Sequence, residues 1–473
     1  MTESHIAELA IRLGRTDAII REPQVVERLS KDFYWYSPIL KPLLDDKRAE
    51  VIVQPRSVEE IRAIVSYAFT ENIPVTARGS GTGNYGQAVP LEGGIVLDLA
   101  PMDQILAIEP DGVAVCEPGA RLGAIEIAAR KVGWELRCYP STYVKASVGG
   151  FLAGGSGGIG SITYGALRDN HTVRAIEMLT MEKEPRLLHF SGEEVHQILH
   201  SWGTNGIITK IWLALGTRRD WAQIAIAFPT FSHAYDFGER LSQNDDIRKR
   251  LITIFEWPIP SYFLPVRKIC PEEKAIIFCQ VDDPQLATVT AEAEGSGGEV
   301  TWAQPYQEPR RGPLLTDYTW NHTTLWAIKA DPALTYLQCN FDPGQVREQC
   351  RLIRARFGND FWFHMEMVKN DTGRIIPCCL PIVRYRTERY LNEMIDYCRK
   401  IGVSVANPHV NQVEGGGRFR SDNRQLQAKY LFDPNGLLNP GKMATFRKTE
   451  SSQPAPPRPQ ISHAIWINTL IAG

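Results

Sequence analysis

Short apolar runs separated by turn residues fill the first half of the chain and predict alternating strands and helices. The segment Ala49–Pro55 (AEVIVQP) predicts a strand that ends at a proline. The next segment predicts a helix, because Ser57 and Glu60 have the spacing of a capping box and apolar residues then recur at helical intervals. The chain therefore opens its first core with a strand followed by a helix.

The same pattern continues to about residue 215. Strands are predicted at 73–78 (IPVTAR), 93–100 (GGIVLDLA), 112–119 (GVAVCEPG) and 206–215 (GIITKIWLAL), and two strands around a turn at 172–190. A helix is predicted at 121–134 and ends at Gly133. Beyond residue 217 the spacing becomes less regular and richer in aromatic residues, which indicates a second α+β region. The fold class expected is α+β.

Two glycine-rich stretches interrupt this pattern, at Val75–Pro90 (VTARGSGTGNYGQAVP) and Gly149–Gly165 (GGFLAGGSGGIGSITYG). Both are expected to be loops, because glycine favours neither a helix nor a strand interior. Consecutive N–H groups in such loops bind phosphate oxygens. Two phosphate-binding loops suit a ligand with a central pyrophosphate, which is FAD or another dinucleotide. Arg78 either adds a cation there or pairs with a carboxylate inside the fold.

Three glycine motifs resemble nucleotide fingerprints but lack the required context. The G-x-G-x-x-G at Gly81–Gly86 is followed by a predicted strand instead of a helix, which argues against a Rossmann unit. The second match, Gly155–Gly160, precedes SITYG, which is not expected to start a helix. The run GLLNPGKM has Met443 where a P-loop needs Ser or Thr.

Composition narrows the function classes. The net charge of −2 gives no sign of a nucleic-acid partner. The nine cysteines include no C-x-x-C and fit free thiols in a reducing compartment. No signal peptide and no membrane span are expected, so the predicted location is the cytoplasm.

The glycine loops and their surroundings resemble the FAD-binding flavoproteins typified by vanillyl-alcohol oxidase and p-cresol methylhydroxylase, near the glycolate oxidase subunit and D-lactate dehydrogenase-like branch. The resemblance covers Ala49–Leu215 and Tyr430–Met443. It implies a two-subdomain FAD-binding domain with an α+β cap domain. The implied division is a helical segment at 1–45, the FAD-binding domain at 46–216, the cap at 217–405, a returning segment at 406–446 and a disordered tail at 447–473.

The resemblance also implies which residues contact FAD. The first loop contributes Arg78, Gly79, Ser80, Gly81, Thr82, Gly83 and Asn84. The second contributes Pro140, Ser141, Ser147, Gly149, Gly150, Gly154, Gly157 and Tyr164. Ile208 is expected by the adenosine, and Asn439 and Lys442 near the ring end.

Two departures from the family pattern refine this expectation. Thr82 stands where some members attach flavin through histidine, and Cys138 lies too far from Gly149 to match the cysteine of others. FAD is therefore expected to be non-covalent. The histidine signature G-D-G-N-x-H of the 2-hydroxy-acid branch is absent, so no metal site is predicted, and lactate or glycolate is in doubt as substrate.

Oxidation of an alcohol at flavin usually needs a base, and histidine suits that task near neutral pH. The first candidate is His409, in NPHVNQVEGGG with Glu414. The second is His322, which follows Asn321 in TWNHTTLWAIK. A third pair, His364 and Glu366, alternates on one face of a predicted strand, where a place in the core edge is favoured over a metal or substrate site.

The function expected is an FAD-dependent oxidoreductase that oxidises a CH–OH group of a small alcohol, hydroxy acid or sugar-like substrate. The electron acceptor is oxygen, a quinone or a carrier protein. One alternative is an alkene reductase resembling sterol side-chain reductases, which would load its flavin from NAD(P)H. Another is a flavin-binding module without turnover.

Overall fold

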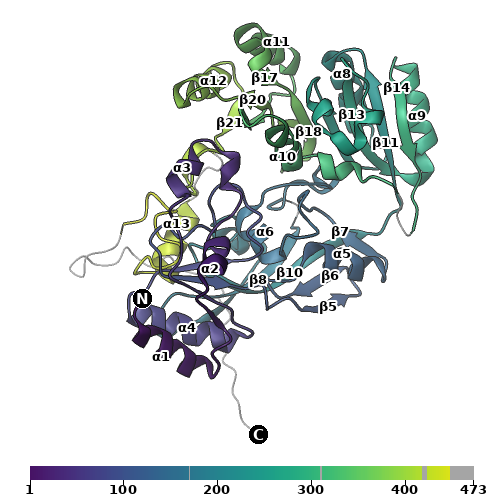
Figure 1. Ribbon diagram of the computed structural model, residues 1–473. Coiled ribbons are helices and arrows are strands. Elements are labelled where there is room, and N and C mark those ends of the chain that lie inside the picture. The colour runs from purple at the N-terminus through teal and green to yellow at the C-terminus, as the bar shows by residue number, and fades with distance from the viewer. Residues whose placement is uncertain (170, 309–311, 418–422, 448–473) are drawn as a thin grey trace.

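The computed structural model describes residues 1–169, 171–308, 312–417 and 423–447. Within these ranges a lower part is built on two sheets and an upper part on a third (Figure 1). We call the upper part, from Trp221 to Ala406, the cap. Apart from residue 447, the tail expected to be disordered lies outside the described residues.

The first sheet of the lower part has the strand order β1-β2-β4-β3. Its strands are β1 (Ile19–Ile20), β2 (Val51–Val53), β4 (Ile95–Asp98) and β3 (Val75–Arg78). Helices α1 (Glu3–Leu13) and α4 (Val58–Thr70) pack against it around one apolar core, and α2 (Pro23–Leu29) packs on its other face. Helix α3 (Leu40–Leu44) lies higher, toward the cap (Figure 1). As predicted, Ser57 caps α4 by accepting the Glu60 N–H at 3.2 Å.

The connection from β3 to β4 carries the first glycine loop. Both strands are parallel, yet the intervening residues 79–94, all of them described, form no helix. A dinucleotide fingerprint of the Rossmann type needs a helix at this point. The rejection of that motif from the sequence is therefore confirmed.

The second sheet is antiparallel and has the order β5-β6-β10-β8-β9, with β7 paired to β10. Its strands are β5 (Ile105–Glu109), β6 (Val113–Cys116), β7 (Trp134–Leu136), β8 (Val173–Leu179), β9 (Leu187–Ser191) and β10 (Ile207–Thr217). Helix α5 (Leu122–Arg130) precedes β7, as its pattern predicted. The predicted pair of strands around a turn is the antiparallel pair β8 and β9.

The second glycine stretch is not a continuous loop, which corrects the expectation from its composition. Helix α6 (Val148–Gly154) forms in it, and the one-turn helix α7 (Ser161–Tyr164) begins where no helix start was expected. Val148, Phe151 and Leu152 bury one side of α6 in the core. A Cβ added to Gly149 would lie 2.7 Å from the Cβ of Pro118. Burial and close packing thus outweigh the poor helix propensity of glycine.

The cap is built on an eight-stranded sheet in the order β14-β11-β13-β12-β18-β19-β16-β21. The strands are β14 (Glu299–Gln304), β11 (Trp221–Phe228), β13 (Ala275–Asp282), β12 (Lys249–Phe255), β18 (His364–Lys369), β19 (Ile375–Cys379), β16 (Gln338–Asn340) and β21 (Ser404–Ala406). Four helices cover its outer face, namely α8 (Phe231–Gln243), α9 (Leu286–Gly295), α11 (Val346–Phe357) and α12 (Glu388–Lys400). A small sheet of β15 (Leu334–Tyr336), β20 (Ile382–Arg384) and β17 (Phe361–Trp362) flanks it.

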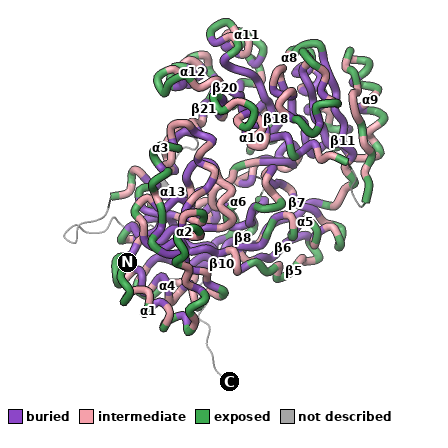
Figure 2. The backbone as a smooth tube through the Cα atoms, viewed as in Figure 1, coloured by how far each residue is buried: buried purple, intermediate pink, exposed green. Residues whose placement is uncertain are grey.

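The inner face of the cap sheet packs toward the lower part through an aromatic cluster. Phe255 and Phe278 of the sheet join Tyr36, Tyr85 and Trp202 of the lower part in one core. Helix α10 (Asn321–Ala330) lies beside this cluster. Figure 2 shows buried backbone running through both parts and along their contact. The cap and the lower part therefore share one apolar core.

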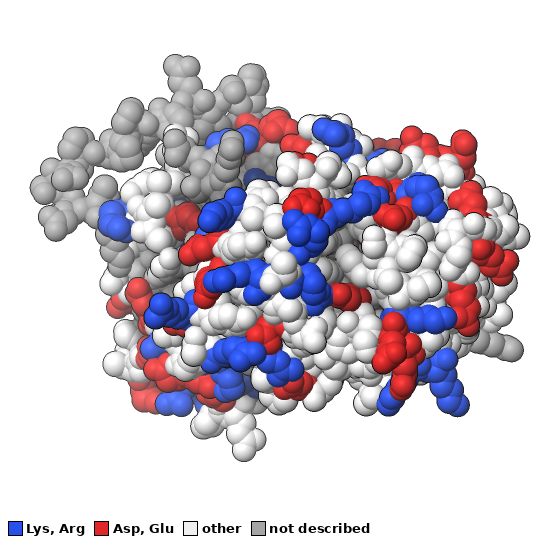
Figure 3. All heavy atoms as spheres, turned by 90° about the horizontal axis from the view of Figure 1, so that it is seen from above, with Lys and Arg blue, Asp and Glu red and all other residues white. Residues whose placement is uncertain are grey.

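The C-terminal segment returns to the lower part. After α13 (Asn423–Phe432), Leu438 pairs with Val75 of β3 and joins the core of the first sheet. On the face seen in Figure 3, Lys and Arg side chains are interspersed with Asp and Glu. Within the described ranges, none of the helices has both the length and the apolar composition of a bilayer-spanning segment.

Candidate active site

Residues from the lower part and from the cap line one cavity of about 830 Å³. This volume lies in the range of roughly 300–1,000 Å³ that is typical of ligand sites. Most residues implied by the family resemblance line it: Arg78, Gly79, Ser80, Gly81, Thr82, Gly83, Asn84, Pro140, Ser141, Ser147, Gly149, Gly150, Gly154, Gly157 and Ile208. The cavity is thus formed by both glycine stretches and closed by the cap.

The first glycine loop lines the cavity with main-chain N–H groups that lack a protein acceptor. Among the described residues, no hydrogen-bond acceptor lies within reach of the N–H groups of Gly81, Thr82 and Gly83. Gly81 has a φ of +62°, and a Cβ there would lie 2.0 Å from Nη2 of Arg78. All three residues are half-buried, so water can reach these N–H groups, and successive N–H groups of this kind can bind the oxygens of a phosphate.

The two glycine stretches contact each other where both meet the cavity. The N–H of Ser80 donates to Oγ of Ser147 at 3.2 Å. A Cβ added to Gly79 would lie only 2.2 Å from the same oxygen. Gln87 joins the stretches again, because its Nε2 donates to the Gly154 carbonyl at 3.0 Å. A side chain at Gly79 would push the two stretches apart and open the cavity wall.

Arg78 is tied into the fold as well as lining the cavity. Its Nη1 donates to the Lys31 carbonyl at 2.7 Å, and 6% of the residue is exposed. Burial lowers the pKa of Arg78, while the neighbouring carboxylates of Asp32 and Asp98 oppose that shift. The pair with a carboxylate that the sequence allowed is not this contact, because the acceptor is a main-chain carbonyl, while Arg78 does line the cavity where a cation was the other possibility.

Three residues expected at the cofactor do not line the cavity. Asn439 donates from Nδ2 to the carbonyls of Gln87 and Trp202, at 2.8 and 2.7 Å. Lys442 is fully buried and its Nζ donates to the Gly86 carbonyl at 2.6 Å. Both therefore support the end of the first glycine loop from behind. The Tyr164 ring lies under the guanidinium of Arg137 instead, with 5.4 Å from Cζ to the ring centre.

Of the catalytic candidates, Asn321 and His322 line the cavity. They form the start of α10, which follows Trp320 with its unusual φ of +53°. Burial lowers the pKa of His322 to about 4, and the charge of nearby Lys329 acts in the same direction. His322 is therefore neutral at pH 7, and the same burial makes its ring a weaker base than a free imidazole.

The structure does not fit the first choice of base, His409. This residue is 3% exposed and does not line the cavity. Its Nδ1 lies 2.8 Å from Oγ of Ser37 and its Nε2 lies 2.9 Å from the carbonyl oxygen of Tyr336. Both ring nitrogens thus join the N-terminal segment to the cap. Long-range packing decided this placement, and the sequence around His409 carries no sign of it.

Glu414 is likewise occupied by a structural task. Its carboxylate accepts the N–H groups of Ala444 and Thr445, at 2.9 and 3.2 Å, and it does not line the cavity. It therefore fixes the chain after the C-terminal turn. Its proposed part in catalysis does not fit this position.

His364 and Glu366 are buried in the centre of the cap sheet, and neither lines the cavity. The Nε2 of His364 lies 2.9 Å from Oε1 of Glu366. Their strand β18 lies inside the sheet, between β12 and β19, and not at the core edge that the sequence favoured. Among the described residues, no group of three or more His, Cys, Asp or Glu side chains is arranged to hold a metal ion.

Comparison with known proteins assigns the fold and the cofactor. A sequence profile described as an FAD binding domain matches residues 49–182. The chain is 35% identical over 434 residues to the glycolate oxidase subunit GlcD of Escherichia coli K12, which covers 84% of this chain and 83% of that protein. The chain belongs to the FAD-binding family of the p-cresol methylhydroxylase and vanillyl-alcohol oxidase type. It is an FAD-linked oxidase or dehydrogenase.

Other relatives match this flavoprotein in part or in fold alone. The D-lactate dehydrogenase of Archaeoglobus fulgidus is 34% identical over 205 residues, which span 41% of this chain and 45% of that protein. The structure of an alkyldihydroxyacetonephosphate synthase superposes with a TM-score of 0.71 at 16% identity and covers 94% of this chain and 86% of that one. The 4-ethylphenol oxidase of Gulosibacter chungangensis superposes with a TM-score of 0.66 at 18% identity, with 93% and 96% covered.

The N-terminal segment of the flavoprotein contributes to the cavity, which sequence reasoning missed. Asp32, Phe33, Trp35 and Tyr36 all line it. Asp32 accepts the N–H of Ala88 at 3.3 Å, and burial raises its pKa to about 6 while the charge of Lys442 opposes the shift. The dense run DFYWYS was the available signal, because so many aromatic residues between two helices need a buried partner.

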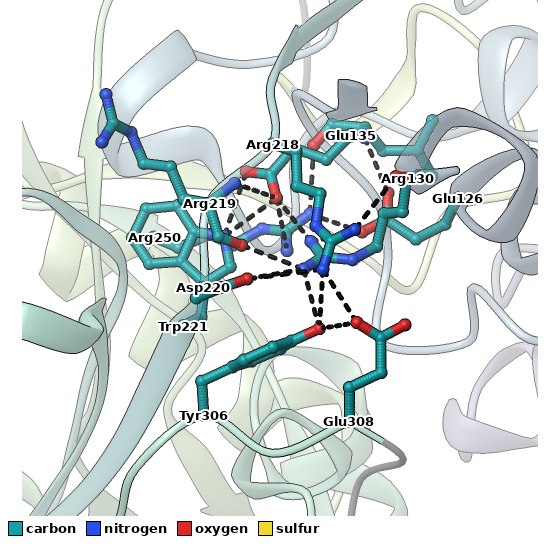
Figure 4. A network of polar contacts seen from close by, with 11 residues as sticks. Glu126, Arg130, Glu135, Arg218, Arg219, Asp220, Trp221, Arg250, Tyr306 and Glu308 are labelled. Atoms are coloured by element: carbon teal, nitrogen blue, oxygen red, sulfur yellow. Dashed lines mark hydrogen bonds and ion pairs between the residues drawn. The ribbon is translucent and has the colours of Figure 1, made fainter. Parts of the chain in front are cut away.

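A network of charged side chains joins the FAD-binding part of the flavoprotein to the cap (Figure 4). Arg250 of β12 lies at its centre, 3.4 Å from Glu126 and 3.7 Å from Glu135. Glu135 of β7 also accepts Nη1 of Arg130 at 2.8 Å and Nε1 of Trp221 at 3.0 Å. Arg250 additionally binds the Gly160 N–H through its carbonyl, at 2.9 Å. The network thus connects the cap to the second glycine stretch.

Proposed function

We propose that this flavoprotein oxidises the CH–OH group of a small alcohol, hydroxy acid or sugar-like substrate. One observation carries the proposal: the imidazole of His322 lines the same cavity as the first glycine loop, where the N–H groups of Gly81, Thr82 and Gly83 make no hydrogen bond to another described residue. The N–H groups suit the phosphates of FAD, and the neutral imidazole suits a substrate hydroxyl. Both requirements of the reaction thus meet in one enclosed space.

The chain's own residues would divide the work. When bound, FAD supplies the acceptor for the hydride that leaves the substrate carbon. His322 accepts the hydroxyl proton, and the negative charge that develops on oxygen favours its protonated form. Asn321 lines the cavity beside it and offers an amide to orient the hydroxyl group. The cap contributes one wall of the site through Trp320, Asn321 and His322.

Lys329 supports a hydroxy acid among the three substrate types. It lines the same cavity, and its charge lies near enough to His322 to lower the pKa of that ring. A substrate carboxylate would find its counter-ion there. The Lys329→Met variant should raise KM for hydroxy acids and leave KM for neutral alcohols unchanged. Equal KM changes for both types would contradict this assignment.

FAD is proposed to be bound without a covalent link. Thr82 occupies the loop position of a histidine attachment, and Cys138 lies outside the cavity with its Sγ 3.3 Å from Oγ of Ser161. Acid precipitation should release all of the yellow colour into solution. A coloured pellet would show a covalent link.

The decisive experiment mixes the anaerobic holoenzyme with a panel of alcohols, 2-hydroxy acids and sugars and follows the loss of flavin absorbance. Replacing His322 by Gln should slow this reduction by about a hundredfold, as expected for loss of a general base, and should leave FAD content intact. The matched control is His189→Gln, because His189 lies on β9 and does not line the cavity. Unchanged single-turnover reduction in the His322 variant would remove it from the mechanism.

The same preparation tests the electron acceptor. We propose oxygen, a quinone or a carrier protein as the acceptor, and reoxidation of the reduced flavin by each distinguishes them. Bleaching by NAD(P)H instead of an alcohol would indicate an alkene reductase. A flavin that no substrate reduces would indicate a module without turnover.

A further inference from the structure

Trp320 holds a strained main-chain conformation at the wall of the cavity. Its φ of +53° and ψ of −137° lie outside the regions that residues with a Cβ favour. Such a residue persists only where its surroundings fix it, and these residues gather at functional sites. Trp320 lines the cavity and immediately precedes Asn321 and His322. The strain is therefore located where the proposed catalytic groups enter α10.

The buried carboxylate of Glu366 fixes this conformation. Its Oε1 accepts the main-chain N–H of Trp320 at 2.7 Å. The same oxygen lies 2.9 Å from Nε2 of His364, and Oε2 accepts the hydroxyl of Thr253 at 2.5 Å. Glu366 is 1% exposed and His364 is fully buried. Contacts from three residues converge on this one buried side chain, and they fix the acceptor oxygen of the Trp320 N–H.

His364 contacts the same oxygen of Glu366 that accepts the Trp320 N–H, and it helps to hold the carboxyl group in place. Its ring stacks on Phe255, with centroids 5.0 Å apart and planes at 21°. Its Nε2 also lies 3.4 Å from Oγ1 of Thr323, in the first turn of α10. Strand β18 and helix α10 are thus joined at adjacent points, and the cap sheet sets where α10 begins.

The Trp320 ring in turn touches the second glycine stretch. A Cβ added to Gly157 would lie 3.1 Å from Cη2 of this ring. Gly157 lines the cavity as well. A shift of the Trp320 main chain would therefore move both the ring over Gly157 and the start of the helix that carries His322.

We propose that Glu366, oriented by His364, is a positioning residue that holds Trp320 in its positive-φ conformation and so aims Asn321 and His322 into the cavity. This inference rests on the proposed function for the roles of Asn321 and His322. A buried hydrogen-bonded polar group is often no more stabilising than an apolar group of the same shape. Packing alone therefore does not require a polar side chain at Glu366. Its hydrogen bond to Trp320, which sets the position of α10 relative to Gly157, explains why one is present.

The test replaces Glu366 by Leu, which removes the acceptor, and by Gln, which keeps an oxygen for the Trp320 N–H. The matched control is Thr253→Val. Thr253 donates to Oε2 of Glu366, whereas the Trp320 N–H donates to Oε1, so this variant leaves the acceptor of the Trp320 N–H in place. The first readout is hydrogen exchange of the Trp320 amide in the FAD-loaded protein. We expect about tenfold or faster exchange in Glu366→Leu, and near-normal exchange in Glu366→Gln and Thr253→Val.

The second readout separates positioning from a general loss of structure. Substrate reduction of the flavin should slow by about tenfold or more in Glu366→Leu and recover in Glu366→Gln, while dithionite reduction stays unchanged in every variant. Unchanged exchange in a folded Glu366→Leu protein would overturn the inference, as would equal effects of Glu366→Leu and Thr253→Val. If Glu366→Leu does not fold, the test rests on Glu366→Gln, which keeps the acceptor oxygen. Exchange of the Trp320 amide that is accelerated equally in Glu366→Gln and Thr253→Val would then overturn the inference.

The exchange measurement needs no turnover. If no alcohol or hydroxy acid reduces the wild-type flavin, the proposed function fails while the exchange result still decides the anchoring of Trp320. If substrate reduces the flavin slowly in Glu366→Leu while the Trp320 amide exchanges at the wild-type rate, the positioning role of Glu366 is overturned and the proposed function is not. The two failures are thereby distinguished.

Discussion

Replacing Arg250 by Leu tests how strongly the charged network of Figure 4 holds the cap against the FAD-binding part. The Arg250 side chain is 7% exposed and donates to the Leu136 carbonyl at 3.1 Å. Its guanidinium also lies 4.7 Å from the ring centre of Tyr139. Removing one partner of a buried ion pair costs about 3–5 kcal/mol, because the other charge stays buried.

The size of the loss follows from what Glu135 would keep. Glu135 is 1% exposed, and burial raises its pKa while Arg250 opposes the shift. Without Arg250 it still accepts hydrogen bonds from Arg130 and Trp221. We therefore expect a loss near the lower end, about 3 kcal/mol in the free energy of unfolding.

Urea unfolding of the FAD-loaded protein, followed by circular dichroism, measures this loss. Arg267→Leu is the control, because Arg267 pairs with Glu272 at 3.1 Å while 57% and 73% of the two side chains are exposed. A surface pair of this kind contributes about 1 kcal/mol or less. If Arg250→Leu lost no more stability than Arg267→Leu, the argument that the network joins the two parts would be refuted.

Three further predictions concern pH, the glycine loop and the C-terminal segment. The pKa of His322 is lowered from 6.5 to about 4 in the folded state, so on acidification the unfolded chain binds the proton first. The free energy of unfolding should therefore fall by about 3 kcal/mol as the pH drops through this interval. Urea titrations at several pH values should show a flatter dependence for His322→Gln, and equal dependence in the two proteins would contradict the shift. Gly81→Ala should weaken FAD binding about tenfold or more in a fluorescence titration. The control Gly192→Ala has a φ of +56° and nothing within 4 Å of the added Cβ, so it should show the backbone strain alone and keep its FAD affinity. Equal loss of FAD affinity in both variants would mean that backbone strain, and not the cavity wall, is responsible. Lys429→Met should destabilise by about 3–5 kcal/mol, because it leaves the fully buried Asp433 carboxylate without its cation; a smaller loss in urea unfolding would show that Asp433 is neutral in the fold.

Much of the local structure follows from short patterns. The strand and helix of the first sheet, the cap on α4 at Ser57 and the strand after the first glycine loop depend on neighbouring residues, so the sequence predicts them. The rejection of a Rossmann unit depends only on the absence of a helix between β3 and β4. The first glycine stretch was recognisable as a loop for the same reason, because glycine disfavours helix and strand interiors locally, whereas the second stretch forms α6 and α7.

The active-site assignments depended on contacts between distant segments. The sequence favoured His409 over His322 as the base, but only His322 reaches the cavity, because His409 is held by Ser37 and Tyr336. The helix α6 forms in spite of its glycines because its apolar face is buried. Neither outcome has a local signal.

The sequence by itself determined the family, the two glycine-rich stretches and the residue types that bind phosphate, since these are properties of contiguous residues. The tertiary structure alone decided that Asp32 and its aromatic neighbours line the cavity, that Lys442 supports the loop from behind and that Glu366 anchors Trp320. These contacts join residues tens to hundreds of positions apart, and side-chain packing between sheets selects them. The order of neighbouring residues in the sequence contains no information on which of these distant residues come into contact.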